Sequence, residues 1–242
     1  ITGNVTGINA RQPEVAQALG DRFDLAVLGQ WRAGSPVQLE KLQLTGNGLS
    51  AALKGAIDKF IYTGDIVLQA NSLMPFSALA DRSLAGSLDL KATGTVALLT
   101  GGFDLTLDGT AENIKTGEDI ADRIINGRST LSGGLARSEN GFSARGFRIG
   151  NDANAITANG TFSSKDADFD LGVEIGDIAD LSDKATGPLS LKASARGTEN
   201  RIALAARASV PSGSLDGRKL NDGLLDFNAV LDGSDPKIAP SL

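Results

Sequence analysis

Apolar and polar residues alternate along most of this 242-residue chain, and this period of two limits its fold more than any other feature. Successive side chains of a β-strand point to opposite faces, so alternation predicts strands with one apolar and one polar face. Residues 103–108 read FDLTLD, which places a phenylalanine and two leucines on one face and two aspartates and a threonine on the other. The same alternation recurs at residues 88–92, 169–175, 189–193 and 202–208, so we expect an all-β protein.

Short turn signals separate the alternating segments. Glycine and asparagine adopt the backbone conformations that tight turns need, and they cluster between the expected strands. The spacing predicts antiparallel strands joined by hairpins, because parallel pairing requires longer crossovers. The turn signals are Gly46-Asn47-Gly48, Gly101-Gly102, Asn140-Gly141, Asn151-Asp152 and Asp232-Gly233.

Helical signals are few and short. A proline at the start or a glycine after the end predicts short helices at residues 13–19 and 117–126, and weaker helical turns at 75–81 and 177–183. None of these segments is long enough to cover a sheet. The apolar face must therefore fold over itself or contact an apolar ligand.

Two arrangements of the sheet would protect this face. In a β-sandwich two apolar faces interdigitate and favour bulky side chains, whereas a curled open sheet leaves an apolar trough along its length. The 30 glycines and the many alanines favour the trough, because small side chains leave space where large ones would fill it. We therefore predict an extended, repetitive antiparallel sheet curled into a U-shaped, taco-like trough with a few short helices, and we keep β-sandwich repeats as the alternative.

The sequence also repeats itself at a spacing of about 100 residues. We expect one continuous β-repeat segment over residues 1–242, with repeat 1 at about 1–106, repeat 2 at about 107–205 and a partial repeat 3 at about 206–242. Such an array predicts a fragment of a longer chain. The matches include Gly29 with Gly134, Leu42 with Phe147 and Gly55 with Gly160 at an offset of 105, and residues 86–92 with 187–193 at an offset of 101.

Composition argues against catalysis and against nucleic acid as a partner. The chain has no histidine and no cysteine, which removes histidine-dependent nucleophiles and the commonest metal ligands. Asp166–Asp177 departs from a calcium loop at the required glycine and at the final glutamate, so we predict no catalytic residue, no metal and no cofactor. The net charge is −6 and no basic run occurs, so we expect no nucleic-acid binding.

No segment has the length and apolar composition of a spanning helix, and Ile1 does not begin a signal peptide. We therefore expect any membrane anchor to lie outside this sequence.

Three segments have distinctive sequences: residues 119–137 (DIADRIINGRSTLSGGLAR), 142–149 (FSARGFRI) and 155–161 (AITANGT). They resemble the repeats of the TamB family, which are large AsmA-like proteins of Gram-negative bacteria. The resemblance implies a periplasmic β-trough that is anchored in the inner membrane by a helix absent here. It also implies phospholipid transport between the two membranes, and outer-membrane protein assembly with the barrel protein TamA through parts outside this fragment.

The alternation and the resemblance together predict a non-catalytic hydrophobic groove for phospholipid acyl chains, with outer-membrane proteins as further clients. The alternative is a structural or adhesive repeat protein of the cell surface, which would bury the same residues as plain core. The predicted groove residues are Leu88, Leu90, Phe103, Leu105, Leu107, Phe169, Leu171, Val173, Ile175, Leu189, Leu191, Ile202 and Leu204.

Overall fold

The computed structural model describes residues 2–6, 20, 22–163, 165–198 and 201–232, and these are overwhelmingly β-strand. The chain divides into two compact units, residues 1–132 and 133–242. The predicted all-β, antiparallel class is confirmed, and the sheet of each unit is open. The division falls within β8 (Arg128–Ser138), whereas the sequence places a repeat boundary near residue 106.

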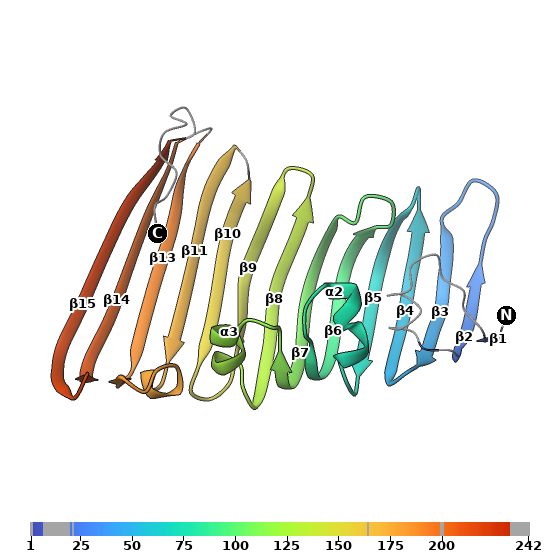
Figure 1. The fold of residues 1–242 in the computed structure, drawn as a ribbon. Helices are drawn as coiled ribbons and strands as arrows, with labels where there is room; N and C mark the ends of the chain where they lie inside the picture. Colours follow the sequence, from blue (N-terminus) through green and yellow to red (C-terminus); the bar gives the residue numbers. More distant parts are fainter. Residues whose placement is uncertain (1, 7–19, 21, 164, 199–200, 233–242) are drawn as a thin grey trace. The chain divides into compact units, whose positions relative to one another are not determined.

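Unit 1 contains an antiparallel meander in which each strand pairs with the next one along the chain (Figure 1). Three hairpins lie at one end of the meander, and the longer helical connections lie at the other. The strands are β1 (Thr2–Thr6), β2 (Arg22–Gln30), β3 (Val37–Gly46), β4 (Leu49–Asp58), β5 (Ile61–Ala70), β6 (Ala85–Ala97) and β7 (Phe103–Lys115).

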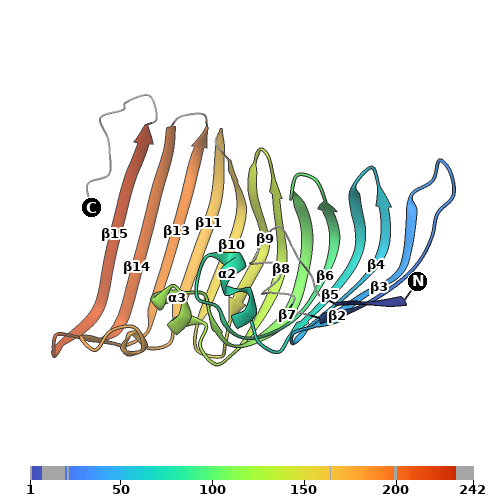
Figure 2. The same ribbon diagram turned by 45° about the vertical axis from the view of Figure 1, so that its right-hand side comes forward.

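Unit 2 continues the same local pattern, and β13 and β12 both pair with β14. Figure 2 shows that the long strands bend near one end. The strands are β9 (Gly141–Gly150), β10 (Ala155–Ser163), β11 (Asp166–Ile175), β12 (Ala185–Thr186), β13 (Leu189–Thr198), β14 (Arg201–Leu215) and β15 (Arg218–Asp232).

The helical segments are short, as the sequence predicts. The predicted helix at 117–126 is α3 (Asp119–Ile124), which contacts β7 and has a buried Ile124. The two weaker helical predictions correspond to η1 (Met74–Phe76) with α2 (Ser77–Ala80), and to η2 (Ile178–Asp180). The predicted helix at 13–19 lies outside the described residues. No helix in the described part of the chain is long and apolar enough to span a membrane.

Three glycines on neighbouring strands form a row across unit 1. Gly64 of β5 is paired with Gly55 of β4 on one side and with Gly94 of β6 on the other. A Cβ atom on Gly64 would overlap the carbonyl oxygen of Lys54, so the strands approach too closely for any larger residue. The glycine row therefore leaves a strip of backbone without side-chain cover.

Tyr62 covers this strip and is the largest fully buried side chain, at 2% exposure. Its phenol oxygen lies 2.6 Å from the carbonyl oxygen of Asp65 and 3.0 Å from that of Lys54, across the position of Gly64. Burial raises the pKa of Tyr62 above the ordinary tyrosine value. In a sheet of one layer, a single aromatic ring thus replaces the packing that a second layer would supply.

The two units share backbone irregularities at the offset found in the sequence. The pairing of β3 with β4 shifts between Leu39 and Leu42, and the pairing of β9 with β10 shifts between Ala144 and Phe147, which is 105 residues further on. β5 and β11 each span 10 residues at the same offset. The bulge therefore recurs as a feature of the repeat and not as an accident of one strand.

We predict that replacing Tyr62 destabilises the fold in proportion to what is removed. Tyr62→Ala uncovers the glycine row and lowers the free energy of unfolding by about 3 kcal/mol or more, as for other large buried aromatics. Tyr62→Phe keeps the ring and removes only the hydroxyl contacts, so the loss is about 1 kcal/mol. Urea denaturation of the two variants measures both values, and equal stability of Tyr62→Ala and the parent would show that the ring covers nothing essential.

Candidate functional site on the apolar face

In unit 1 the strand register gathers apolar residues on one face of the sheet. Leu105 of β7 is paired with Gly94, and Leu107 with Ala92 of β6, which continues the row to Ile66 of β5. From β4 to β7 every residue that these pairings place on this side is apolar or glycine, apart from Tyr62. Five of the predicted groove residues lie here, namely Leu88, Leu90, Phe103, Leu105 and Leu107, and all are half-buried.

Unit 2 repeats this arrangement on its own sheet. Leu171 of β11 is paired with Ala158 of β10 and with Ala193 of β13, and the row continues to Ala206 of β14 and Phe227 of β15. From β9 to β15 the paired residues on this side carry no charge as far as the pair of Val210 and Gly223 in β14 and β15. The other eight predicted groove residues share the side: Phe169, Leu171, Val173, Ile175, Leu189, Leu191, Ile202 and Leu204. We call these two surfaces the apolar face of unit 1 and of unit 2.

The apolar face of unit 2 is partly open even at its centre. β11 has paired neighbours on both sides, yet the side chain of Leu171 is 37% exposed. The buried apolar positions of the two faces are mostly short, such as Ala92, Ala111 and Ala167. Cross-strand neighbours cover an alanine, but they leave a longer side chain projecting from the layer.

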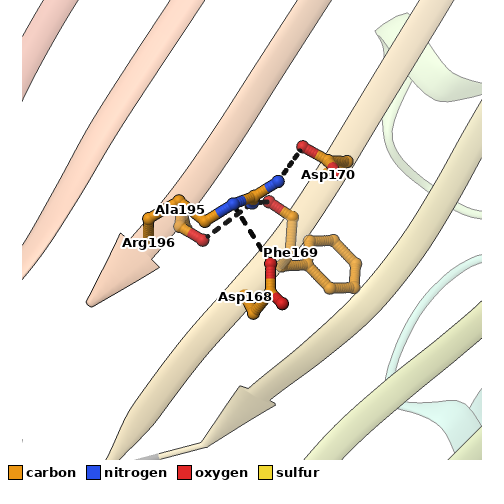
Figure 3. A network of polar contacts seen from close by, with 5 residues as sticks. All are labelled: Asp168, Phe169, Asp170, Ala195 and Arg196. Carbon is orange, nitrogen blue, oxygen red and sulfur yellow. Dashed lines mark hydrogen bonds and ion pairs between the residues drawn. The ribbon is translucent and has the colours of Figure 1, made fainter. Parts of the chain in front are cut away.

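The opposite face is polar, and in unit 2 several of its charges form ion pairs. Figure 3 shows Arg196 of β13 beside Asp168 and Asp170 of β11. Nε of Arg196 lies 3.1 Å from Oδ1 of Asp168, and its Nη2 lies 2.6 Å from Oδ1 of Asp170. Nη1 of Arg196 also donates to the carbonyl oxygen of Phe169 at 2.7 Å. These side chains are substantially exposed, so each ion pair stabilises the sheet only slightly. Their main consequence is that this face is charged and polar, in contrast to the apolar face on the other side of the sheet.

Two carboxylates, those of Asp122 and Asp177, accept hydrogen bonds from nearby residues and thereby have a structural role. Asp122 Oδ1 accepts from the backbone N–H of Thr116 at 2.6 Å and from its hydroxyl at 2.8 Å. Burial alone would raise the pKa of Asp122, but these hydrogen bonds lower it overall. Asp177 accepts from the N–H groups of Ala179 and Gly187, which lower its pKa. Both residues fix connections between strands.

Acidic residues in the described part of the chain form no group that could hold a metal ion. The stretch from Asp166 to Asp177, whose spacing superficially suggests a calcium loop, is β11 followed by a turn. Its alternating carboxylates lie on the polar face, where Asp168 and Asp170 contact Arg196. The arrangement offers ion pairing and no convergent ligand set.

A hollow of about 480 Å³ opens on the polar face of unit 2 around Gly172. Glycine leaves this gap between Thr157 and Lys192, the residues that flank it on the paired strands. The hollow is bordered by both acidic and basic residues, and Leu171 is the one predicted groove residue in its lining.

Sequence reasoning missed several residues of the apolar face. The bulge puts Leu39 and Leu42, three positions apart, on the same side, which a strict period of two cannot reveal. Ile66 and Leu68 were missed because the residue between them, Val67, is also apolar. Val67 lies on the polar face, so the sequence does not alternate there. The other missed residues of this kind include Leu53, Phe147, Ile149, Ile156, Leu225 and Phe227.

Comparison with protein-family models, with curated proteins and with solved structures finds no match to this chain. The resemblance to TamB repeats therefore stays a prediction from the sequence, and the argument for function depends on the geometry of the two faces.

We predict that Asp122 stabilises unit 1 in a pH-dependent manner. Because its folded pKa is lowered, its contribution is present above the unfolded pKa and is lost as the pH falls through the folded one. Asp122→Asn should lower the urea midpoint at neutral pH and should reduce the further loss on acidification. Asp119→Asn makes the same charge change in the same helix and serves as the control. If the urea midpoints of the two variants change with pH in the same way, the pH dependence does not come from the hydrogen bonds of Asp122.

Proposed function

We propose that this chain is a non-catalytic β-repeat segment whose apolar faces bind phospholipid acyl chains. The proposal includes a TamB-like role in the periplasm, carrying lipid between the inner and outer membranes or assisting outer-membrane protein assembly with a TamA-like barrel. The support is physical: the faces are continuous, lack charged residues over several strands, and belong to sheets of one layer in the described part of each unit.

The exposure of Leu171 is the observation on which the proposal chiefly depends. A central strand of a sandwich core would bury this leucine completely. Leaving a leucine in water instead of burying it costs about 1.5 to 3 kcal/mol. A row of such residues on adjacent strands is therefore a surface on which an apolar ligand would be stabilised.

The chemistry of the two faces favours a ligand made of hydrocarbon. Acyl chains need neither hydrogen bonds nor counter-charges, and the apolar face supplies neither. Leu171, Leu191 and their neighbours repeat at the strand spacing of about 4.8 Å, so a ligand chain would meet similar contacts along its length. Many similar weak contacts hold a chain without fixing its position, which suits transport better than storage.

We expect photocrosslinking to distinguish the apolar face from the polar one. A photoreactive residue at an apolar-face position should capture phospholipid in cells, and the same probe one residue earlier should not. The test positions are Leu105, Leu171 and Leu191, and the matched controls are Asp104, Asp170 and Ser190. Equal capture at test and control positions would exclude selective binding by this face. Native mass spectrometry of the purified protein would identify a lipid that remains bound.

We further expect Leu171→Asp to fold and to lose lipid. The side chain is 37% exposed, so the new carboxylate would remain hydrated and the free energy of unfolding should fall by no more than about 2 kcal/mol. An acyl chain at the same place would face a charge without a partner, so lipid recovery should drop. If the variant instead unfolds, the leucine is plain core, as in a structural or adhesive repeat protein. Asp170→Leu, which alters the neighbouring polar position, is the control for general effects of substitution.

A further inference from the structure

Large apolar side chains are exposed at the tips of the three hairpins in unit 1. These tips lie at the same end of the meander, at the top of Figure 1. The connection after β2 presents Trp31, the turn between β4 and β5 presents Phe60, and the turn between β6 and β7 presents Leu98 and Leu99. Their exposed fractions are 67%, 61%, 52% and 74%, and we call these four residues the tip cluster.

The tip cluster is held in place and adjoins the apolar face. The backbone N–H of Leu98 donates to the carbonyl oxygen of Phe60 at 2.9 Å, which joins two of the three tips. The first row of the apolar face follows directly, with Ile57 paired to Val37 and to Tyr62. The tips therefore lie at the strand ends where the apolar face of unit 1 begins.

The backbone at Phe60 is strained. Lys59 and Phe60 have φ values of 46° and 64°, the positive values that a two-residue hairpin of type I′ requires. Asparagine or aspartate followed by glycine normally occupies such turns, as Asn47-Gly48 does between β3 and β4. A bulky residue in the left-handed region is unfavourable and is most often found where function requires it. The position of Phe60 is thus unfavourable in two ways: its backbone has a positive φ, and its apolar ring is exposed to water.

The hairpin fold itself does not require apolar tips. At the offset of 105 that relates β5 to β11, Phe60 corresponds to Lys165, which is exposed in the turn between β10 and β11. At the offset of 101, Leu98 and Leu99 correspond in sequence to Glu199 and Asn200. In the described turn between β10 and β11 the repeat thus builds a hairpin with a polar tip, so an apolar tip is not needed for such a hairpin to form.

We propose that the tip cluster docks unit 1 on the surface of a phospholipid bilayer, with Trp31, Phe60 and Leu99 inserted at the level of the headgroups. Tryptophan is enriched at this interface, and leucine and phenylalanine add the apolar area that anchors a peripheral protein. Arg32 and Lys59 stand next to Trp31 and Phe60 in the sequence and can meet lipid phosphates. Docking at the tips would bring the adjoining apolar face to the place where acyl chains are available.

Trp31 is the only tryptophan of the chain, so its fluorescence reports on this docking directly. Mixing the 242-residue chain with vesicles of phosphatidylethanolamine and phosphatidylglycerol should shift the emission to shorter wavelength. Brominated acyl chains in the same vesicles should quench it. If the emission wavelength of Trp31 does not change when vesicles are added, the proposal is wrong. So does a shift that follows protein concentration without lipid, because the cluster would then bind a second copy of the chain.

Variants separate docking from folding. Phe60→Gly should weaken vesicle binding by about tenfold, the loss expected for one large apolar anchor, while the melting temperature stays equal or rises because the turn strain is relieved. Leu99→Ser should weaken binding similarly. Met74→Ser is the matched control, since Met74 is 66% exposed at the opposite strand ends of unit 1 and should leave binding unchanged.

Equal loss in the Met74 control would mean that any exposed apolar residue suffices, which contradicts a specific docking edge. The proposal is independent of acyl-chain binding by unit 2. Leu171→Asp should leave the Trp31 shift intact, and Phe60→Gly should leave photocrosslinking at position 191 of purified protein with detergent-solubilised phospholipid intact.

Discussion

The rest of this structure depends on one constraint, which is that an antiparallel sheet of one layer has no second layer to cover its apolar side. Lateral hydrogen bonds satisfy the backbone, but they do nothing for the side chains that project from the sheet. Most of the buried apolar positions in the strands are small, and Ala92, Ala144 and Ala167 are examples. Larger side chains such as Leu171 remain partly in water, and that residual exposure is the basis of the proposed lipid binding.

The same constraint explains where the chain uses glycine and tyrosine. Gly55, Gly64 and Gly94 let three strands approach closely, and Tyr62 then covers the bare backbone. In unit 2 the corresponding row contains Phe169 in place of Gly64, and the packing is solved differently, with the ring of Phe142 at 6.3 Å from that of Phe169. The repeat thus preserves the strand register and the bulge while the residues that cover the sheet change.

Much of this could be predicted from sequence because a strand projects its side chains with a fixed period. Alternation at residues 103–107 and 169–175 determines which residues share a face, and all 13 predicted groove residues do lie on the apolar face of their unit. The bulge between Leu39 and Leu42 could not be predicted, since it breaks the period locally. The turn at Lys59-Phe60 could not be predicted either, because it lacks the glycine that marks such turns.

The two units differ at equivalent hairpin tips, where unit 1 has Phe60 and unit 2 has Lys165, and this difference indicates which residues selection has acted on. A hairpin tip lies in water and contributes little to packing, so its residues are free to vary unless they contact something else. Lys165 is the outcome expected of such freedom, whereas Phe60 combines an exposed ring with a strained backbone in the equivalent turn. The bilayer contact proposed for the tip cluster would compensate for a residue that is unfavourable for both folding and solubility. The same reasoning applies to the apolar face, because the proposed acyl-chain ligand would stabilise its exposed leucines by covering them.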